Sequence, residues 1–310
     1  MRRPLPLTVS GLTMTALTVS AAVVATAVLV TALTVALRGE PPQRRPGTRV
    51  TAAGLPAPVP CRGCRHPAPV TSWEWRLESV PTEPFLDVGM YDIDGFEATA
   101  ATVERLHATR PGRIVVCYIS AGTYEKWRPD AARFPSDVLG EPMDEWEGER
   151  WLDIRRYDGT LGAILRERMD MCRAKGFDAV EFDNVDGYDG DRTGFPLTAG
   201  DQLRFNAWLA NEAHARGLSA GLKNDIRQLE TLRPYFDWAL NEECWAKREC
   251  TGEQTGGHGY DAWIAAGKPV FNVEYDLDPG SFCDRANAQN FNSLRKSHDL
   301  DATRTPCRGA

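Results

Sequence analysis

The sequence predicts an α/β protein: a (β/α)8 barrel preceded by an N-terminal signal or anchor segment and a proline-rich linker. After residue 70, short apolar runs alternate with amphipathic stretches, which is typical of a parallel sheet with crossover helices. Two amphipathic stretches end in a basic residue and a glycine, Lys175-Gly176 and Arg216-Gly217, each followed directly by an apolar run, as helices end. Eight such runs in about 240 residues fit a (β/α)8 barrel, which takes about 250.

The first 70 residues of the 310 differ from the rest. Arg2 and Arg3 precede an uncharged run over residues 4–37, the layout of an export signal and long enough to span a bilayer. Residues 1–37 are therefore a cleaved signal peptide or a membrane anchor, and both alternatives stay open. Residues 38–70 are rich in proline and arginine without an aromatic residue, which predicts a linker. Residues 71–310 hold all nine tryptophans and form the predicted barrel domain.

The N-terminal segment and the cysteines predict an extracellular protein, either secreted or anchored to the outer face of the cytoplasmic membrane through residues 4–37. The eight cysteines are an even number, which in an exported protein indicates disulfides. We expect Cys244 with Cys250 and Cys283 with Cys307, whereas Cys117 and Cys172 could be paired or free. The Cys61-Arg62-Gly63-Cys64 motif lacks a second cysteine or histidine pair in sequence, so a local disulfide is favoured over zinc.

The predicted strands and helices follow in order along residues 71–310. A doubly wound open sheet is the rival fold, but it usually begins with a glycine-rich βα turn, which this sequence lacks. The expected strands are Trp73–Leu77, Asp87–Asp92, Ile114–Ser120, Trp151–Ile154, Ala179–Asn184, Ser219–Asn224, Trp238–Glu242 and Val270–Tyr275. The expected helices are Thr99–Thr109, Leu161–Lys175, Asp201–Arg216 and Asp261–Ala266.

Side chains along each strand alternate between two faces. We expect the apolar set to face the helices and the polar set to face the barrel axis. Buried charge is costly unless it is paired or used, so a polar barrel interior indicates a functional site. The polar set comprises Glu181, Asp183, Lys223, Asp225, Asn272 and Glu274.

Carboxylates gather at the predicted carboxyl ends of the strands, where barrel enzymes have their active sites. Paired carboxylates of different pKa are what cleavage of a glycosidic bond requires.

Residues 1–70 carry eight arginines and one acid, whereas the rest of the chain carries 28 bases and 42 acids. An acidic body argues against a nucleic-acid partner. The five scattered histidines show no His-x-x-x-His pair, so we expect no metal and no cofactor.

Seven ordered blocks between about Trp73 and Tyr275 resemble glycoside hydrolase family 114, the endo-α-1,4-polygalactosaminidases. The blocks are Tyr91–Asp94, Cys117–Glu125, Gly148–Ile154, Phe182–Tyr188, Gly221–Asp225, Asn241–Cys244 and Gly267–Phe271. The resemblance implies a (β/α)8 barrel that cleaves α-1,4-linked galactosamine-containing polymers. It further implies that Asp183, in the Asp-Asn-Val-Asp block, and Glu242, in the Asn-Glu block, form the catalytic pair.

The alternation of side chains along the strand and the family resemblance disagree about which glutamate is the second catalytic carboxylate. If Trp238 and Leu240 face the helices, Asn241 and Glu243 turn inward and Glu242 does not. A bend or bulge at the strand end could re-aim the side chain, so Glu242 is preferred and Glu243 is held in reserve. Asp183 is expected as nucleophile or base and Glu242 as general acid. The sequence does not decide between retention and inversion, which depends on the carboxylate separation.

The remaining expectations concern the substrate and its contacts. We expect a polysaccharide partner and a monomeric protein. A non-catalytic polysaccharide- or cell-wall-binding barrel is the alternative from another class, since fold alone does not separate binder from enzyme; a glycosidase of the same mechanism acting on another glycan is the second. The substrate-binding residues expected from their positions are Asp92, Asp94, Tyr118, Asp153, Lys223, Asn224, Glu274 and Trp75.

Overall fold

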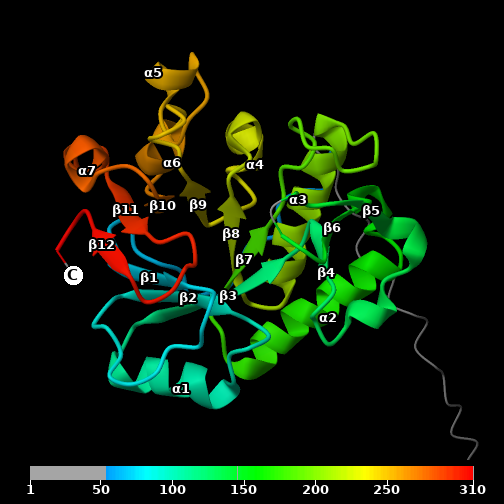
Figure 1. Cartoon of the computed structure of the whole chain (residues 1–310), viewed down its shortest axis with the longest axis horizontal. Coiled ribbons are helices and arrows are strands. Elements are labelled where there is room, and N and C mark those ends of the chain that lie inside the picture. The colour runs from blue at the N-terminus through cyan, green and yellow to red at the C-terminus, as the bar shows by residue number, and fades with distance from the viewer. Residues whose placement is uncertain (1–53, 145, 310) are drawn as a thin grey trace, which may run out of the picture. The chain divides into compact units, whose positions relative to one another are not determined.

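The computed structural model describes residues 54–144 and 146–309, so the expected signal or anchor at 1–37 lies outside the described residues. Eight parallel strands form the wall of a barrel, shown in Figure 1. They are β1 (Trp73–Arg76), β2 (Met90–Asp94), β3 (Ile114–Ser120), β7 (Ala179–Asp183), β8 (Ser219–Lys223), β9 (Trp238–Glu242), β10 (Val270–Glu274) and β11 (Phe291–Lys296).

Side-chain contacts complete the barrel between its first and last parallel strands. A short strand, β12 (Arg304–Pro306), pairs antiparallel with β11. Across the gap, the indole N–H of Trp73 donates to the carbonyl oxygen of Asn292 at 2.9 Å. The buried ammonium of Lys296 lies 2.9 Å from the carboxylate of Glu74. These contacts join β1 to β11 where the backbones are not paired.

Helices follow most strands and cover the outside of the barrel (Figure 1). They are α1 (Ala100–Thr109), α2 (Thr160–Lys175), α3 (Ala199–Ala215), α4 (Leu229–Leu232), α5 (Gly252–Thr255), α6 (Asp261–Ala265) and α7 (Pro279–Ala288). The four predicted helices are confirmed to within two residues at each end. Gly176 and Gly217 have φ of 91° and 73°, the left-handed conformation that ends a helix at glycine. Short 3-10 turns lie at Ala131–Arg133, Ser136–Val138, Ile154–Arg156 and Ile226–Gln228.

One predicted barrel strand was wrong. The run Trp151–Ile154 contributes to β6 (Glu149–Leu152), which pairs antiparallel with β4 (Thr123–Glu125) and β5 (Leu139–Pro142) in an insertion between β3 and α2. The eighth barrel strand is instead β11, which the prediction missed. Its sequence, Phe-Asn-Ser-Leu-Arg-Lys, has no apolar run, because its polar side chains are buried and hydrogen-bonded within the wall, as Ser293 is to Asn272 at 2.8 Å.

The barrel interior is an apolar core closed by a charged layer. The inward side chains form one cluster: Trp73, Trp75, Met90, Ile114, Val116, Ala179, Trp238, Leu240, Phe271, Val273, Tyr275, Leu294 and Leu300. The side chains on the other face of the strands pack beneath the helices. They include Val180, Phe182, Ala220 and Leu222. Gly221 makes room for Trp238, because a Cβ there would lie 2.3 Å from the indole ring.

The predicted facing is confirmed for β7 and β8 and wrong for β9 and β10. In β9, Trp238 and Leu240 point inward, and in β10 Phe271 and Val273 do the same. The polar residues of β10 therefore face outward, contrary to the expectation for Asn272 and Glu274. The physical reason is that a barrel needs an apolar floor, and the large side chains of β9 and β10 fill it.

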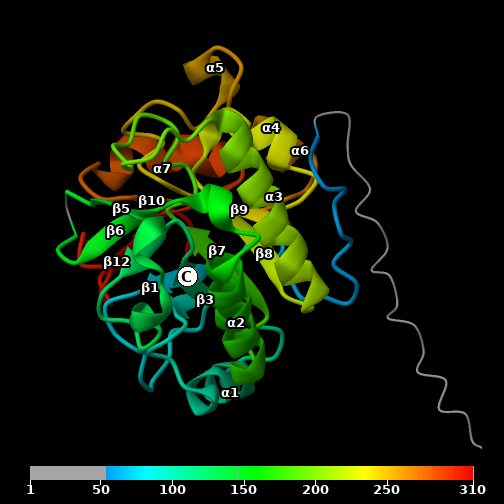
Figure 2. The same cartoon turned by 90° about the vertical axis from the view of Figure 1, so that its right-hand side faces the viewer.

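The described part of the expected linker, residues 54–70, contacts the barrel. The hydroxyl of Tyr235 donates to the carbonyl oxygen of Pro56 at 2.5 Å, and Asn211 of α3 donates to that of Ala57 at 3.0 Å. Arg65 forms an ion pair with Asp178 at 2.8 Å. Figure 2 shows the start of this segment, in blue, running alongside α3.

Four disulfides use all eight cysteines. The expected pairs Cys244–Cys250 and Cys283–Cys307 and the local bridge Cys61–Cys64 are confirmed, and Cys117 is paired with Cys172. No helix within residues 54–144 and 146–309 combines the length and the apolar character needed to cross a membrane.

Candidate active site

Three adjacent strands end in side chains that meet above the apolar core. Asp183 ends β7, Lys223 ends β8 and Glu242 ends β9. The Lys223 ammonium lies 2.8 Å from Oδ1 of Asp183 and 2.9 Å from Oε2 of Glu242. Lys223 is 2 % exposed, whereas the two carboxylate side chains are 19 % and 26 % exposed. The buried cation therefore brings together two carboxylates that both reach solvent.

The backbone bends directly after each of these strands. Asn184, Asn224 and Glu243 have φ of 58°, 46° and 63°, a left-handed conformation that asparagine tolerates better than most residues. The side-chain oxygen of Asn224 accepts a hydrogen bond from the backbone N–H of Glu242 at 3.0 Å. Asn224 therefore positions the end of β9.

Glu242 and Glu243 point in different directions, as successive side chains of a strand do. Glu242 continues the inward parity of Trp238 and Leu240 and contacts Lys223. Glu243 pairs with Lys247 at 3.2 Å. The structure therefore brings Glu242, and not Glu243, to Asp183.

Two tyrosines donate hydrogen bonds to the carboxylates from opposite sides. Tyr118 donates to Oδ2 of Asp183 at 2.8 Å, and Tyr275 donates to Oε1 of Glu242. Burial alone would raise the pKa of Asp183, but the charge of Lys223 and the hydrogen bonds from Lys223 and Tyr118 bring that pKa below its usual value. Asp183 is therefore ionised at neutral pH.

A pair of buried carboxyl groups lies below Lys223. Glu181 is 3.5 Å from the ammonium and accepts a hydrogen bond from the indole of Trp75 at 3.1 Å. Burial and the neighbouring Glu181 raise the pKa of Asp92 well above its usual value. Two adjacent buried carboxyls cannot both ionise, so Asp92 keeps its proton. Burial also raises the pKa of Glu181 to about 7 against the opposing charge of Lys223, so Glu181 changes charge near neutral pH.

A second carboxyl group lies beside Asp183 on the insertion sheet. Glu149 of β6 accepts hydrogen bonds from Thr123 and, at 3.3 Å, from Asn184. Burial raises the pKa of Glu149 to about 7, and the charges of Glu125 and Asp183 act in the same direction. The site thus contains a carboxyl group that changes charge near neutral pH.

An open cavity of about 710 Å³ lies between the insertion sheet and the β7–α3 loop. Its lining includes Trp151, Glu141, Asp144 and Asp191. Burial raises the pKa of Asp186 to about 7, and the charges of Asp191 and Asp183 raise it further. Acidic groups therefore extend from the Asp183 end of the site toward this cavity.

Comparison with known proteins identifies the family. Residues 56–310 match the model of a protein family described as "Glycoside-hydrolase family GH114". The chain belongs to family GH114. It is 30 % identical to an uncharacterized protein of Deinococcus radiodurans over 235 residues, which are 69 % of this chain and 73 % of that relative.

Two solved structures of other proteins resemble this one. The structure of Aspergillus fumigatus Ega3 in complex with galactosamine is 37 % identical, covers 78 % of this chain and 96 % of its own, and has a TM-score of 0.70. The glycoside hydrolase domain of PelA from Pseudomonas aeruginosa is 16 % identical, covers 76 % and 97 % of the two chains, and has a TM-score of 0.59; it shares the fold. This protein is thus a glycoside hydrolase with a barrel fold.

The structure of this GH114 protein brings most of the predicted site residues together. Asp183, Glu242, Lys223 and Tyr118 meet at the mouth of the barrel. Asn224 contributes through the backbone of Glu242. Asp92 and Trp75 are 0 % and 1 % exposed, so they form the floor of the site and do not reach a ligand.

Three predicted substrate-binding residues are engaged in contacts of their own. Asp94 forms an ion pair with Arg128 at 2.7 Å. Asp153 pairs with Arg155 at 2.7 Å, because its strand belongs to the insertion sheet. Glu274 faces away from the barrel axis and accepts the backbone N–H of Trp245 at 2.9 Å. These carboxylates hold loops in place.

Sequence reasoning missed Tyr275 and Glu149 as site residues. Tyr275 lies on the same inward face as Phe271 and Val273. A prediction that turned these side chains of β10 toward the barrel axis would have placed Tyr275 in the site. Glu149 could not be found from parity, because its strand lies in an insertion that the barrel pattern does not predict.

Proposed function

We propose that this protein is an endo-acting glycoside hydrolase that cleaves α-1,4-linked galactosamine-containing polysaccharide with two carboxylates. Asp183 is the nucleophile and Glu242 is the general acid and base. The observation that carries the proposal is the shared contact of both carboxylates with Lys223 at the carboxyl ends of the strands, the end at which barrel enzymes act.

The carboxylate spacing supports a retaining reaction. Because one nitrogen contacts Oδ1 of Asp183 and Oε2 of Glu242, these two oxygens are at most about 6 Å apart. Retaining glycosidases separate their carboxyls by about 5–5.5 Å, whereas inverting enzymes need about 6.5–9.5 Å to admit a water. The shorter range fits the pair.

The surroundings of the two residues support these roles. Asp183 is held ionised by Lys223 and Tyr118, so it can attack the anomeric carbon and form a covalent glycosyl intermediate. Glu242 has the more exposed side chain and can take a proton from solvent. It gives this proton to the leaving glycosidic oxygen and then removes a proton from the water that releases the sugar.

The proposed substrate rests on the similarity to Ega3 and on the charge of the cavity lining. Ega3 was solved in complex with galactosamine and is 37 % identical to this chain. Protonated amino sugars are cations at neutral pH, and the open cavity between the insertion sheet and the β7–α3 loop is lined by three acids, Glu141, Asp144 and Asp191, and by one cation, Arg192. An acidic cleft favours a cationic polymer.

We further propose that the enzyme acts outside the cytoplasm, since its four disulfides persist in oxidising compartments.

The test is the release of reducing ends from defined polymers. The full chain, folded under oxidising conditions, is incubated with partly deacetylated α-1,4-galactosaminogalactan and with its fully N-acetylated form. We expect new reducing ends from the deacetylated polymer and none from the Asp183→Asn variant at unchanged melting temperature. Binding without cleavage would replace the proposal with a polysaccharide-binding barrel, and cleavage of another glycan alone would overturn the substrate.

A further inference from the structure

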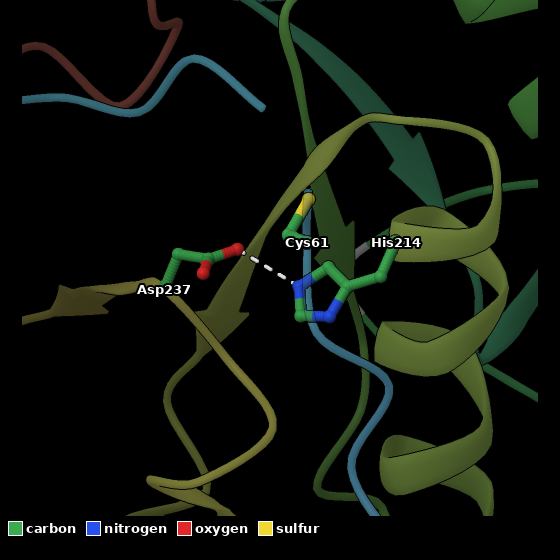
Figure 3. Close-up of side chains that lie close together, drawn as sticks. All are labelled: Cys61, His214 and Asp237. Carbon is green, nitrogen blue, oxygen red and sulfur yellow. Dashed lines mark hydrogen bonds and ion pairs between the residues drawn. The ribbon is translucent and has the colours of Figure 1, made fainter. Parts of the chain in front are cut away.

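A cluster of metal-ligating side chains lies at the opposite end of the barrel from Asp183 and Glu242. Cys61 belongs to the N-terminal segment, His214 to the last turn of α3, and Asp237 directly precedes β9. One sulfur, one imidazole nitrogen and one carboxylate oxygen from these residues all lie within 4.8 Å of one another. Figure 3 shows the sulfur of Cys61 and the carboxylate of Asp237 close to the imidazole of His214.

Hydrogen bonds already orient the imidazole as metal sites require. Nδ1 of His214 lies 2.6 Å from the carbonyl oxygen of Val59. A carbonyl oxygen only accepts, so Nδ1 carries a proton and donates it. Metal-bound histidines commonly donate their other N–H to a backbone carbonyl in this way, which fixes the tautomer and the ring orientation. The nitrogen that remains for a ligand, Nε2, lies 2.9 Å from Oδ2 of Asp237.

The carboxylate and the sulfur are held in place as well. Oδ2 of Asp237 accepts the backbone N–H of Ala220 at 2.9 Å, and a supporting hydrogen bond of this kind is typical of ligating carboxylates. The sulfur of Cys61 lies 3.3 Å from the carbonyl oxygen of Leu218. His214 is 8 % exposed, so its imidazole is buried beneath the N-terminal segment, whereas Cys61 and Asp237 are half-buried.

Cys61 is bonded to Cys64 in the structure, so neither sulfur is a free thiolate in this state. A disulfide sulfur is a poor ligand, whereas the thiolates of a Cys-x-x-Cys motif commonly bind one zinc ion together. A dithiol or phosphine reductant breaks the S–S bond with two electrons and two protons, and both thiols lose their protons on binding a metal. The fold supplies the imidazole and the carboxylate that the sequence motif lacks.

We propose that Cys61, Cys64, His214 and Asp237 bind one Zn²⁺ ion when the Cys61–Cys64 disulfide is reduced. Two thiolates, one imidazole and one carboxylate are a tetrahedral donor set suited to zinc. The ion takes the place of the contact between Nε2 of His214 and Oδ2 of Asp237. It ties the N-terminal segment to α3 and to the start of β9, so the site is structural and takes no part in hydrolysis.

The test uses Co²⁺ as a spectroscopic substitute for Zn²⁺ in the full chain. The protein is treated with a mild phosphine, and alkylation with mass spectrometry establishes that Cys61 and Cys64 are reduced. We expect thiolate-to-cobalt charge-transfer absorption at one ion per chain, displaced by Zn²⁺, and no such absorption from the oxidised protein. Failure of the reduced protein to give this absorption would overturn the proposal.

A matched histidine separates ligation from general stability. His107 lies at the end of α1 and contacts Asp178 at 2.8 Å, as His214 contacts Asp237, but it is not part of the cysteine cluster. We expect His214→Ala to weaken Co²⁺ binding at least tenfold and His107→Ala to leave it unchanged. Equal effects of the two variants would contradict the assignment.

A further variant removes the need for reduction. Cys64→Ser leaves the thiol of Cys61 free in protein whose other three disulfides are intact. We expect this variant to bind Co²⁺ through one thiolate, with weaker charge-transfer absorption than the reduced wild type. Absence of that absorption from folded Cys64→Ser protein would refute the site without any question of misfolding.

Discussion

Lys223→Met removes the charge that joins the two proposed catalytic carboxylates. Methionine keeps most of the side-chain volume, so the apolar core below is preserved. The change leaves Asp183 and Glu242 facing each other without the ammonium that lies 2.8 Å and 2.9 Å from them. It also leaves buried Glu181 without its cation at 3.5 Å.

The size of the effect follows from the charge and the distance. Near a protein surface, two unit charges about 4 Å apart interact by about 4 kcal/mol. Losing this amount makes ionisation of Asp183 less favourable, so the pKa of that carboxyl rises. At about 1.36 kcal/mol per pH unit, the acid limb of the profile of kcat/KM against pH moves upward by at most about three units.

The assay is kcat/KM on the deacetylated polymer between pH 4 and pH 9. Lys296→Met is the matched control, because Lys296 is also a buried lysine in contact with a buried glutamate, Glu74, at 2.9 Å. Lys223→Met leaves Glu181 without its cation and should lose at most about 3–5 kcal/mol of stability. Lys296→Met should lose less, because Glu74 keeps Arg304 at 3.3 Å and Arg76 at 3.7 Å. Only Lys223→Met should move the acid limb; an unmoved limb, or an equal movement in Lys296→Met, would refute the reasoning.

Three further variants test other parts of the structure. Tyr275→Phe removes the hydrogen bond to Glu242 and should lower kcat about 10- to 100-fold, since such bonds to charged groups contribute about 1.5–3 kcal/mol, with melting temperature as the control. Burial raises the pKa of Glu149 to about 7, so its contribution to stability is full below about pH 4.5 and is lost as pH rises through 7. Over this range, urea unfolding should show the wild type losing about 3 kcal/mol more stability than Glu149→Gln, since the pKa of Asp186 is raised to about 7 in both proteins. Glu274→Gln removes one of the acceptors of the Trp245 and Ala246 N–H groups and should lower the free energy of unfolding by about 1–3 kcal/mol; an unchanged value would contradict the role given to Glu274.

The barrel could be predicted from the sequence because most of its strands are apolar runs followed by helices with recognisable ends. The prediction failed where burial is achieved by other means. β11 has polar side chains that are satisfied inside the wall, so its sequence does not resemble a buried strand. Trp151–Ile154 is apolar because it packs within an insertion, and its pattern is that of a barrel strand.

The site was predictable in its members and less so in their facing. The carboxylates at the ends of β7 and β9 were found, since strand ends and sequence blocks mark them. Parity alone placed Glu242 on the wrong face, because it assumed that apolar side chains lie under the helices. In β9 and β10 those side chains fill the barrel floor, and this could not be known without the neighbouring strands.

The cluster at Cys61 shows a different limit. Its histidine and aspartate lie 150 residues or more along the chain from the Cys-x-x-Cys motif. Only the packing of the N-terminal segment against α3 brings them together.

The most direct test of the proposed catalytic pair compares Glu242→Gln with Glu243→Gln. The two residues are neighbours and the substitution is the same, yet one contacts Lys223 and the other contacts Lys247. Hydrolysis of the deacetylated polymer should fall about 10²- to 10⁴-fold in Glu242→Gln and stay within about twofold of wild type in Glu243→Gln. Loss of activity in Glu243→Gln with an active Glu242→Gln would contradict the assignment of the pair.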